Sequence, residues 1–141
     1  MNVFVPVQYP LTETNKQAIQ RGIDLVEDDD VSELLIFHMN EVQTDRRINR
    51  QSLRDAVETS FDGLTASYVV RDGFVAEEAL IEAAIQFDMD YIVLSKYRRD
   101  RWKRLLEEVL NLDQDPQQLL HERTGITVEV ITEDEHESSN A

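Results

Sequence analysis

The sequence contains no cysteine, and only three prolines and four glycines among 141 residues. The lack of cysteine excludes a disulfide framework and a thiolate metal site. No apolar run approaches the roughly 18 residues that a membrane-spanning helix needs, so we expect no membrane insertion. The chain begins directly with an apolar segment and has no basic region typical of a signal peptide. The expected location is therefore the cytoplasm.

Lysine is also scarce, because only Lys16, Lys96 and Lys103 occur, and 29 acidic residues outnumber 14 lysines and arginines. The net charge of −15 argues against nonspecific binding of nucleic acid by the surface as a whole. The charge fits a well-solvated surface, and it also fits adaptation to high salt, where electrostatic repulsion reaches only about 3 Å at 1 M. A low lysine content combined with a high content of acidic residues resembles the composition of proteins from halophilic archaea. The composition therefore favours adaptation to high salt.

Short apolar segments alternate with amphipathic ones along the chain. The apolar segments predict strands at 3–7, 34–39, 65–70, 92–94 and 127–131, and the amphipathic ones predict helices at 12–27, 46–61, 75–87, 102–111 and from 116 to Gly125. This alternation predicts one α/β domain over residues 1–131, in which a five-stranded parallel sheet lies between two helical layers, as in Rossmann-like folds. The acidic residues 132–141 are expected to form a disordered tail.

Several local signals refine this prediction. Thr12 and Thr14 are both suitable N-caps for the first helix. Gly22 inside that helix predicts close packing on the sheet. Asp72 and Gly73 predict a turn into the third helix. His38 lies within an apolar strand, where a packed histidine is more common than a catalytic one.

A basic cluster follows the fourth strand and holds six of the fourteen lysines and arginines within residues 96–104. Ligands of open α/β sheets bind beyond the carboxyl ends of the strands, so the cluster suggests an anion site made of arginine side chains. A solvated helix start whose arginines pair with the protein's own acids, or a dimer contact, is the favoured interpretation of the cluster, because charge runs are usually solvated faces. The candidate residues of the anion site are Ser95, Lys96, Arg98, Arg99 and Arg101.

A second basic face begins at the carboxyl edge of the second strand. Its members at a spacing of four residues share one side of the second predicted helix. They are expected at the same edge as the first cluster, although salt bridges to Asp45, Asp55 and Glu58 are the favoured interpretation. The residues of this face are Arg46, Arg47, Arg50 and Arg54.

The sequence offers no catalytic constellation. His121 and His136 have no neighbouring ligands at a spacing that suits a metal, and the acid pairs on the helices lack a base or nucleophile. We therefore expect no metal site and no enzyme activity, because a catalytic mechanism would have no residues to use.

The order of the segments from Val3 to Ile131 resembles the universal stress protein family, which belongs to the adenine-nucleotide-hydrolase-like α/β proteins. The features that carry the resemblance are the segment 3–7 (VFVPV), the strand end 37–39 (FHM), Gly73 before the third helix, and the run 78–85 (EALIEAAI) that leads to 90–94 (DYIVL). The resemblance implies a three-layer fold and a regulatory role in stress responses.

The chain departs from the motifs of the nucleotide-binding members of this family. Gln8 stands where they carry an acidic residue, and Ser95, Arg98 and Glu108 occupy the positions of their phosphate-loop glycines. Val109 replaces the following serine or threonine. Side chains at glycine positions should obstruct the backbone cradle for phosphates. The resemblance therefore argues against the usual ATP site, and no cofactor is expected.

The last strand provides a candidate dimer interface. In the family that the chain resembles, this strand commonly pairs with its copy in a second chain, and a terminal edge strand leaves backbone groups unpaired. An isologous contact would use Ile126, Val128 and Val130. The alternative is a free edge that Glu129 and the acidic tail protect.

Together these observations predict a regulatory homodimer like the universal stress proteins, which binds an unidentified protein partner and does not bind ATP in the family's usual way. The alternative is a sensor of nucleotides or other anions that uses residues 96–104. ATP hydrolysis is the least supported function, because the phosphate loop is missing.

Overall fold

The computed structural model describes residues 1–27, 32–41, 47–73, 76–95, 104 and 125–131. The elements in this part of the chain alternate between strand and helix up to the fourth strand. They are β1 (Asn2–Val7), α1 (Glu13–Val26), β2 (Glu33–Glu41), α2 (Arg50–Ser60), β3 (Ser67–Gly73), α3 (Ala76–Gln86), β4 (Tyr91–Ser95) and β5 (Thr127–Ile131).

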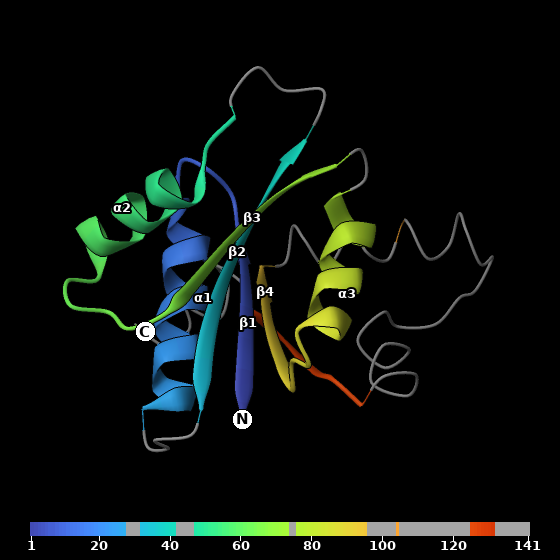
Figure 1. The fold of residues 1–141 in the computed structure, drawn as a ribbon. Coiled ribbons are helices and arrows are strands. Elements are labelled where there is room, and N and C mark those ends of the chain that lie inside the picture. The colour runs from blue at the N-terminus through green and yellow to red at the C-terminus, as the bar shows by residue number, and fades with distance from the viewer. Residues whose placement is uncertain (28–31, 42–46, 74–75, 96–103, 105–124, 132–141) are drawn as a thin grey trace.

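The five strands form one sheet in the order β3-β2-β1-β4-β5, and every neighbouring pair is parallel. Helices α1 and α2 cover one face of this sheet, and α3 covers the other (Figure 1). The structure therefore confirms the predicted α/β fold with a five-stranded parallel sheet. Because all strands run the same way, their carboxyl ends lie along one edge.

The core under α1 and α2 is built from alternate residues of the strands. Val3, Val5 and Val7 of β1 are almost completely buried in it, together with Leu53 and Val57 of α2. Gly22 brings α1 close to the sheet, because a Cβ there would lie 2.8 Å from Leu34 Cδ1 and 3.1 Å from Val5 Cγ2. The close packing predicted at this glycine is confirmed.

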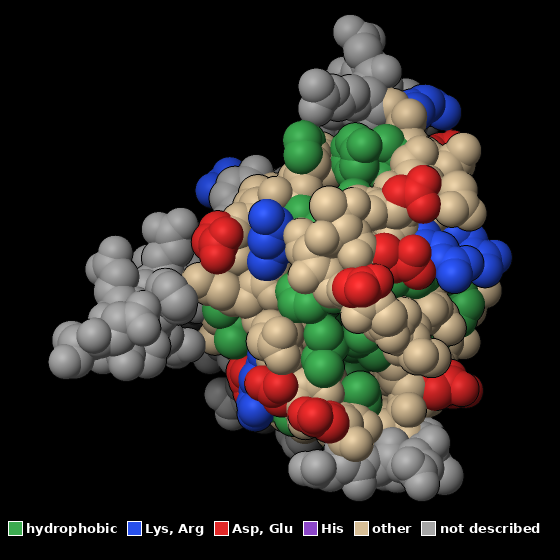
Figure 2. Space-filling view, turned by 90° about the vertical axis from the view of Figure 1, so that its left-hand side faces the viewer, with side chains coloured by type: hydrophobic (Ala, Val, Ile, Leu, Met, Phe, Trp, Pro, Cys, Tyr) green, Lys and Arg blue, Asp and Glu red, His purple; other side chains and the backbone are tan. Residues whose placement is uncertain are grey.

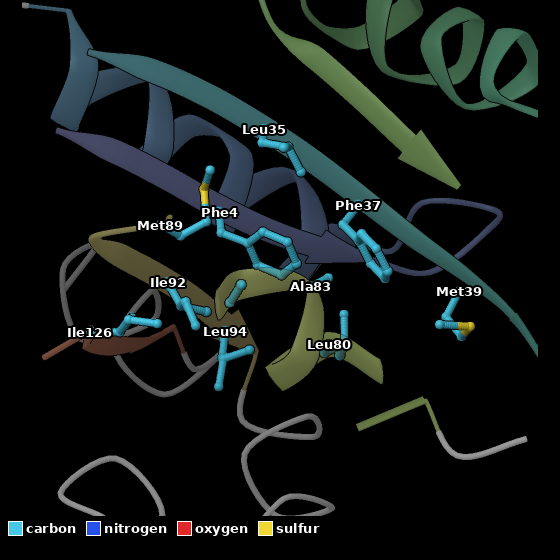
Figure 3. Close-up of a cluster of buried hydrophobic side chains, with 11 residues drawn as sticks. Phe4, Leu35, Phe37, Met39, Leu80, Ala83, Met89, Ile92, Leu94 and Ile126 are labelled. Carbon is cyan, nitrogen blue, oxygen red and sulfur yellow. The ribbon is translucent and has the colours of Figure 1, made fainter. Parts of the chain in front are cut away.

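The core under α3 uses the intervening residues of the same strands (Figure 3). Phe4 and Phe37 lie side by side in neighbouring strands, with 5.3 Å between ring centroids and 35° between ring planes. Leu80 and Ala83 of α3 face them. Both faces of β1 and β2 are therefore covered, which is why the runs 3–7 and 34–37 are continuously apolar.

Two helices begin where a side chain caps them. The Thr12 hydroxyl accepts a hydrogen bond from the Asn15 N–H (3.1 Å), and Asn15 Oδ1 accepts one from the Thr12 N–H (3.2 Å). Thr12 rather than Thr14 is thus the N-cap of α1. The start predicted for α2 at residue 46 is wrong, because Asn49 caps the helix by accepting from the Ser52 N–H at 2.8 Å.

Strands β2 and β3 both extend beyond the apolar segments from which they were predicted. Asn40 pairs with Asp72, and Glu41 pairs with Gly73. The turn predicted at residues 72–73 is therefore wrong, since both residues belong to β3. Pairing of polar residues at the end of two strands has no signature in the hydrophobic pattern.

Other predictions concern residues that lie outside the described ranges. These are the helix at 102–111, of which only residue 104 is described, the helix from residue 116, and the tail 132–141. The domain limits therefore also stay a prediction. Within the described ranges, no helix combines the length and the apolar character needed to cross a membrane.

Candidate functional site

The residues predicted to form the anion site begin at the carboxyl end of β4, whereas a groove lies beside the outer strand β3. Ser95 is half-buried at the end of β4, in register with Ile131 of β5. Lys96, Arg98, Arg99 and Arg101 lie outside the described residues, so the anion site stays a prediction.

An open groove of about 510 Å³ runs beside β3. This volume falls within the range of small-ligand pockets, about 300–1,000 Å³. Its walls come from the end of β2, the segment 47–50 that starts α2, five consecutive residues of β3 (68–72), and Phe87 after α3. The groove thus lies at the outer edge of the sheet, because β3 is the first strand in the sheet order.

Asn40 holds the segment before α2 against the end of β2. Its side chain is only 4% exposed. Asn40 Nδ2 donates to the Ile48 carbonyl oxygen (2.8 Å), and the Ile48 N–H donates to Asn40 Oδ1 (3.1 Å). One amide side chain therefore satisfies both backbone groups of Ile48, and this places Arg47 and Asn49 at the groove.

The charge that lines the groove is mainly positive. Arg47, Arg50 and Arg71 contribute guanidinium groups, and Asp72 contributes one carboxylate. Arg47 Nη1 lies 3.4 Å from Asp72 Oδ2, but both side chains are more than half exposed, so this pair holds them weakly. The Arg71 guanidinium lies over the Phe87 ring, 5.6 Å from its centroid, in a cation–π contact.

In the structure, the described arginines of the predicted second basic face lie in two different environments. Arg47 and Arg50 line the groove, whereas Arg54 forms the predicted type of salt bridge with Glu58 (2.9 Å). Arg46 lies outside the described residues. Sequence reasoning missed Arg71, because its strand was predicted to end at residue 70. The hydrophobic pattern gives no signal for it, because the strand continues through polar residues.

Tyr68 lies at one end of the groove and is 6% exposed. Its buried hydroxyl has no hydrogen-bond partner among the described residues. Burial raises the pKa of this tyrosine, the nearby Glu58 carboxylate raises it further, and Arg54 opposes the change. The hydroxyl therefore stays neutral in the physiological range.

The end of β1 is tied to α1 by the same asparagine that completes the helix cap. Asn15 is 3% exposed, and its Oδ1 also accepts from the Gln8 N–H at 3.0 Å. Gln8 stands at the position where the nucleotide-binding proteins that the sequence resembles carry an acid. The backbone N–H of Gln8 is therefore already hydrogen-bonded to Asn15.

His38 is buried, as predicted, at 9% exposure. Its Nδ1 lies 3.0 Å from the Val7 carbonyl oxygen, and its ring meets Tyr9 edge-on with 6.4 Å between centroids. These contacts give the histidine a packing role between the ends of β1 and β2.

A polar cluster links the outer strand β5 to α1. Glu129 accepts two hydrogen bonds from Arg21, at 2.8 and 3.1 Å, and a third from the Tyr91 hydroxyl at 2.6 Å. Burial alone would raise the pKa of Glu129, but the hydrogen bonds from Arg21 and Tyr91 outweigh it and lower that pKa. Burial raises the pKa of Tyr91, and its bond to the carboxylate adds to the effect.

This cluster gives a testable pH dependence. A lowered carboxyl pKa adds stability above the unfolded value, about 4.3, and the gain is lost as the pH falls through the folded value. Glu129→Gln should therefore cost about 1 kcal/mol of unfolding free energy at neutral pH. The difference from the unsubstituted protein should shrink below about pH 4. Urea unfolding at both pH values measures it.

Glu58→Gln is the matched control, because Glu58 also accepts from an arginine but in an exposed pair. It should cost no more than about 0.5 kcal/mol. If the cost of Glu129→Gln stayed constant between neutral and acid pH, the ionised carboxylate would not be the stabilising form.

The structure places the candidate dimer residues in two environments. Ile126 is 3% exposed and belongs to the core under α3. Val128 and Val130 are half-buried on the outer strand β5. Ile126 therefore packs within its own chain, while the two valines remain partly exposed to solvent. The homodimer stays a prediction.

Acidic and basic side chains are interspersed on the face formed by α1 and α2 (Figure 2). The net negative charge is thus not gathered into one acidic patch on this face. Within the described ranges, no three histidine or acidic side chains are arranged to hold a metal ion.

Comparison with solved structures identifies the fold. A universal stress protein from Archaeoglobus fulgidus DSM 4304 has 15% sequence identity and a TM-score of 0.59, over 93% of this chain and 43% of that one. A universal stress protein in complex with cAMP has 15% identity and a TM-score of 0.52, over 92% of this chain and 95% of that one. This chain thus spans less than half the length of the Archaeoglobus structure.

These similarities show that the chain has the fold of the universal stress proteins, as the sequence resemblance implied. No protein-family model and no curated protein sequence matches the chain.

Proposed function

We propose that this chain is a regulatory module of the universal stress protein type, which acts by binding a protein partner and catalyses no reaction. The observation that carries the proposal is the arginine-lined groove beside β3. It joins the outer strand β3, three guanidinium groups and the start of α2 along the lateral edge of the sheet. The surface of the groove is open, which suits a macromolecular partner.

The proposal includes the loss of the family's usual ATP site. Side chains occupy the positions of the phosphate-loop glycines at Ser95, Arg98 and Glu108, and Gln8 replaces the acidic residue after the first strand. Backbone amides that cradle phosphates need close approach, which glycine allows and longer side chains obstruct.

We also propose a homodimer through β5. The support is that β5 is the outer strand of the sheet and that Val128 and Val130 are incompletely buried. Light scattering coupled to size exclusion would give twice the chain mass of 16.4 kDa for this dimer. A mass of one chain at all concentrations would contradict it.

A sensor of nucleotides or other anions is the second candidate. One observation favours it: a structural neighbour is a universal stress protein in complex with cAMP. In this chain the ligand would bind residues 96–104, where six lysines and arginines follow β4.

A thermal-shift titration at high KCl separates the two functions. The ligands are ATP, AMP, cAMP, cyclic dinucleotides, phosphate and sulfate, each with and without Mg²⁺. A ligand at about 100 times its Kd should add roughly 2.7 kcal/mol of stability. We expect no shift with any of them.

A shift with a nucleotide but not with sulfate would overturn the proposal in favour of the sensor. In that case Arg98→Ala combined with Arg101→Ala should abolish the shift, because these residues belong to the basic cluster.

A further inference from the structure

We propose that the groove beside β3 binds an extended acidic segment of a partner protein, which adds to the sheet as a strand next to β3. The inference rests on the proposed partner-binding function and names its site and the chemistry of the partner.

The first support is the position of β3 as an outer strand of the sheet. Within the described residues, β3 pairs with β2 alone and stands first in the sheet order. An edge strand presents a row of unpaired backbone N–H and C=O groups, which an added peptide strand can pair. Five consecutive residues of β3, from Tyr68 to Asp72, line the groove, so it follows the strand along its length.

The second support is that the groove has walls on both faces of the sheet. Tyr68 and Val70 pack with the core under α1 and α2, whereas Val69 packs with the core under α3. Arg71 lies over Phe87, which also packs on the α3 side. An added strand would point alternate side chains at these two walls.

The third support is charge. Arg47 and Arg50 stand at the start of α2, and Arg71 stands on β3, so three guanidinium groups meet a single carboxylate, Asp72. A guanidinium binds a carboxylate through two parallel hydrogen bonds, which lysine cannot reproduce. In a chain of net charge −15, a locally positive groove discriminates in favour of an acidic segment.

The alternation of side chains specifies a pattern in that segment. Residues that point toward α2 should be acidic and meet Arg47 or Arg50. The intervening residues should be apolar and pack beside Phe87 and the stem of Arg71. A peptide that alternates glutamate and valine, acetylated and amidated at its ends and carrying a fluorophore, is therefore the probe.

The test is fluorescence anisotropy at molar KCl, where the repulsion between the acidic protein and the peptide is screened to a few ångströms. We expect saturable binding, and no binding of a peptide with lysine in place of glutamate. Arg50→Glu combined with Arg71→Glu should weaken binding at least about tenfold, because the first change reverses a charge-assisted contact and the second removes the arginine stem beside which the apolar residues pack.

Arg54→Glu is the matched control, because Arg54 lies one turn along α2, outside the groove lining, and pairs with Glu58. It should change the affinity less than about twofold. The milder pair Arg50→Gln and Arg71→Gln repeats the test, and thermal melting confirms that each variant is folded. If Arg54→Glu weakened binding as much as the variants at Arg50 and Arg71, the groove would not be the binding site.

A separate experiment tests whether the peptide adds to the sheet as a strand. Two further peptides carry N-methyl groups on alternate residues, in opposite phases, so that each removes the backbone donors on one edge. Only one phase should bind, and hydrogen exchange at residues 69–72 should slow when the unmethylated peptide is present. Equal binding of both phases would show that the peptide does not pair with β3.

The outcomes also separate this inference from the proposed function. Absence of peptide binding by a protein that no nucleotide stabilises would overturn the inference and leave the partner-binding module standing. Stabilisation by a nucleotide would overturn the proposed function, whatever the peptide does. Complete displacement of the peptide by sulfate would reduce the groove to a small-anion site and overturn strand addition.

Discussion

Phe37→Ala should lower the free energy of unfolding by about 3–5 kcal/mol, the largest effect we expect from a single substitution. The Phe37 ring on β2 is completely buried and packs against Phe4 with 5.3 Å between ring centroids. Its removal leaves a cavity between β2 and α3 that the surrounding strands cannot close, because both of their faces are already packed. Urea unfolding at high KCl, followed by circular dichroism, gives the difference.

Ile85→Ala is the control for this prediction. Ile85 also belongs to the α3 side of the molecule, but half of its surface is exposed. It should cost less than about 1 kcal/mol, because little apolar area returns to water. Similar losses for Phe37→Ala and Ile85→Ala would mean that the core under α3 is not the main source of stability.

The location of this core was predictable because it depends on local patterns. A continuous apolar run such as 34–39 indicates a strand covered on both faces, and the structure places its alternate residues in two separate cores. The N-cap at Thr12 and the close packing at Gly22 follow from single residues whose chemistry is specific. Such signals are readable without knowledge of the neighbouring elements.

The groove was not predictable in the same way, because it depends on pairing between distant segments. The second strand was predicted to end at residue 39 and a turn was predicted at 72–73, yet residues 40–41 pair with 72–73 and lengthen both strands. This extension carries Arg71 to the wall of the groove. Polar residues pair there without any hydrophobic pattern to reveal it.

The contact between Arg21 and Glu129 illustrates the same limit. The two residues are 108 positions apart and meet because α1 packs across β4 and β5. The sequence identified Glu129 only as a charge on an outer strand. Its arginine and tyrosine donors became visible when the sheet order was known.

Asn40→Ala should cost about 2–3 kcal/mol of unfolding free energy, because it leaves the N–H and C=O of Ile48 without their partner. Asn40 is 4% exposed and forms both hydrogen bonds with one amide group, at 2.8 and 3.1 Å. The loss should also free the segment before α2. Faster hydrogen exchange at the Ile48 amide, together with urea unfolding, measures both effects.

Asn49→Ala is the matched control for this asparagine. It removes the N-cap of α2, worth about 1 kcal/mol, but leaves both bonds to Ile48 in place. If Asn40→Ala left the exchange of the Ile48 amide unchanged, Asn40 would not be what holds Arg47 at the groove. The position of Arg47 would then depend on the cap of α2 alone, and Asn49→Ala would be the substitution that alters peptide binding.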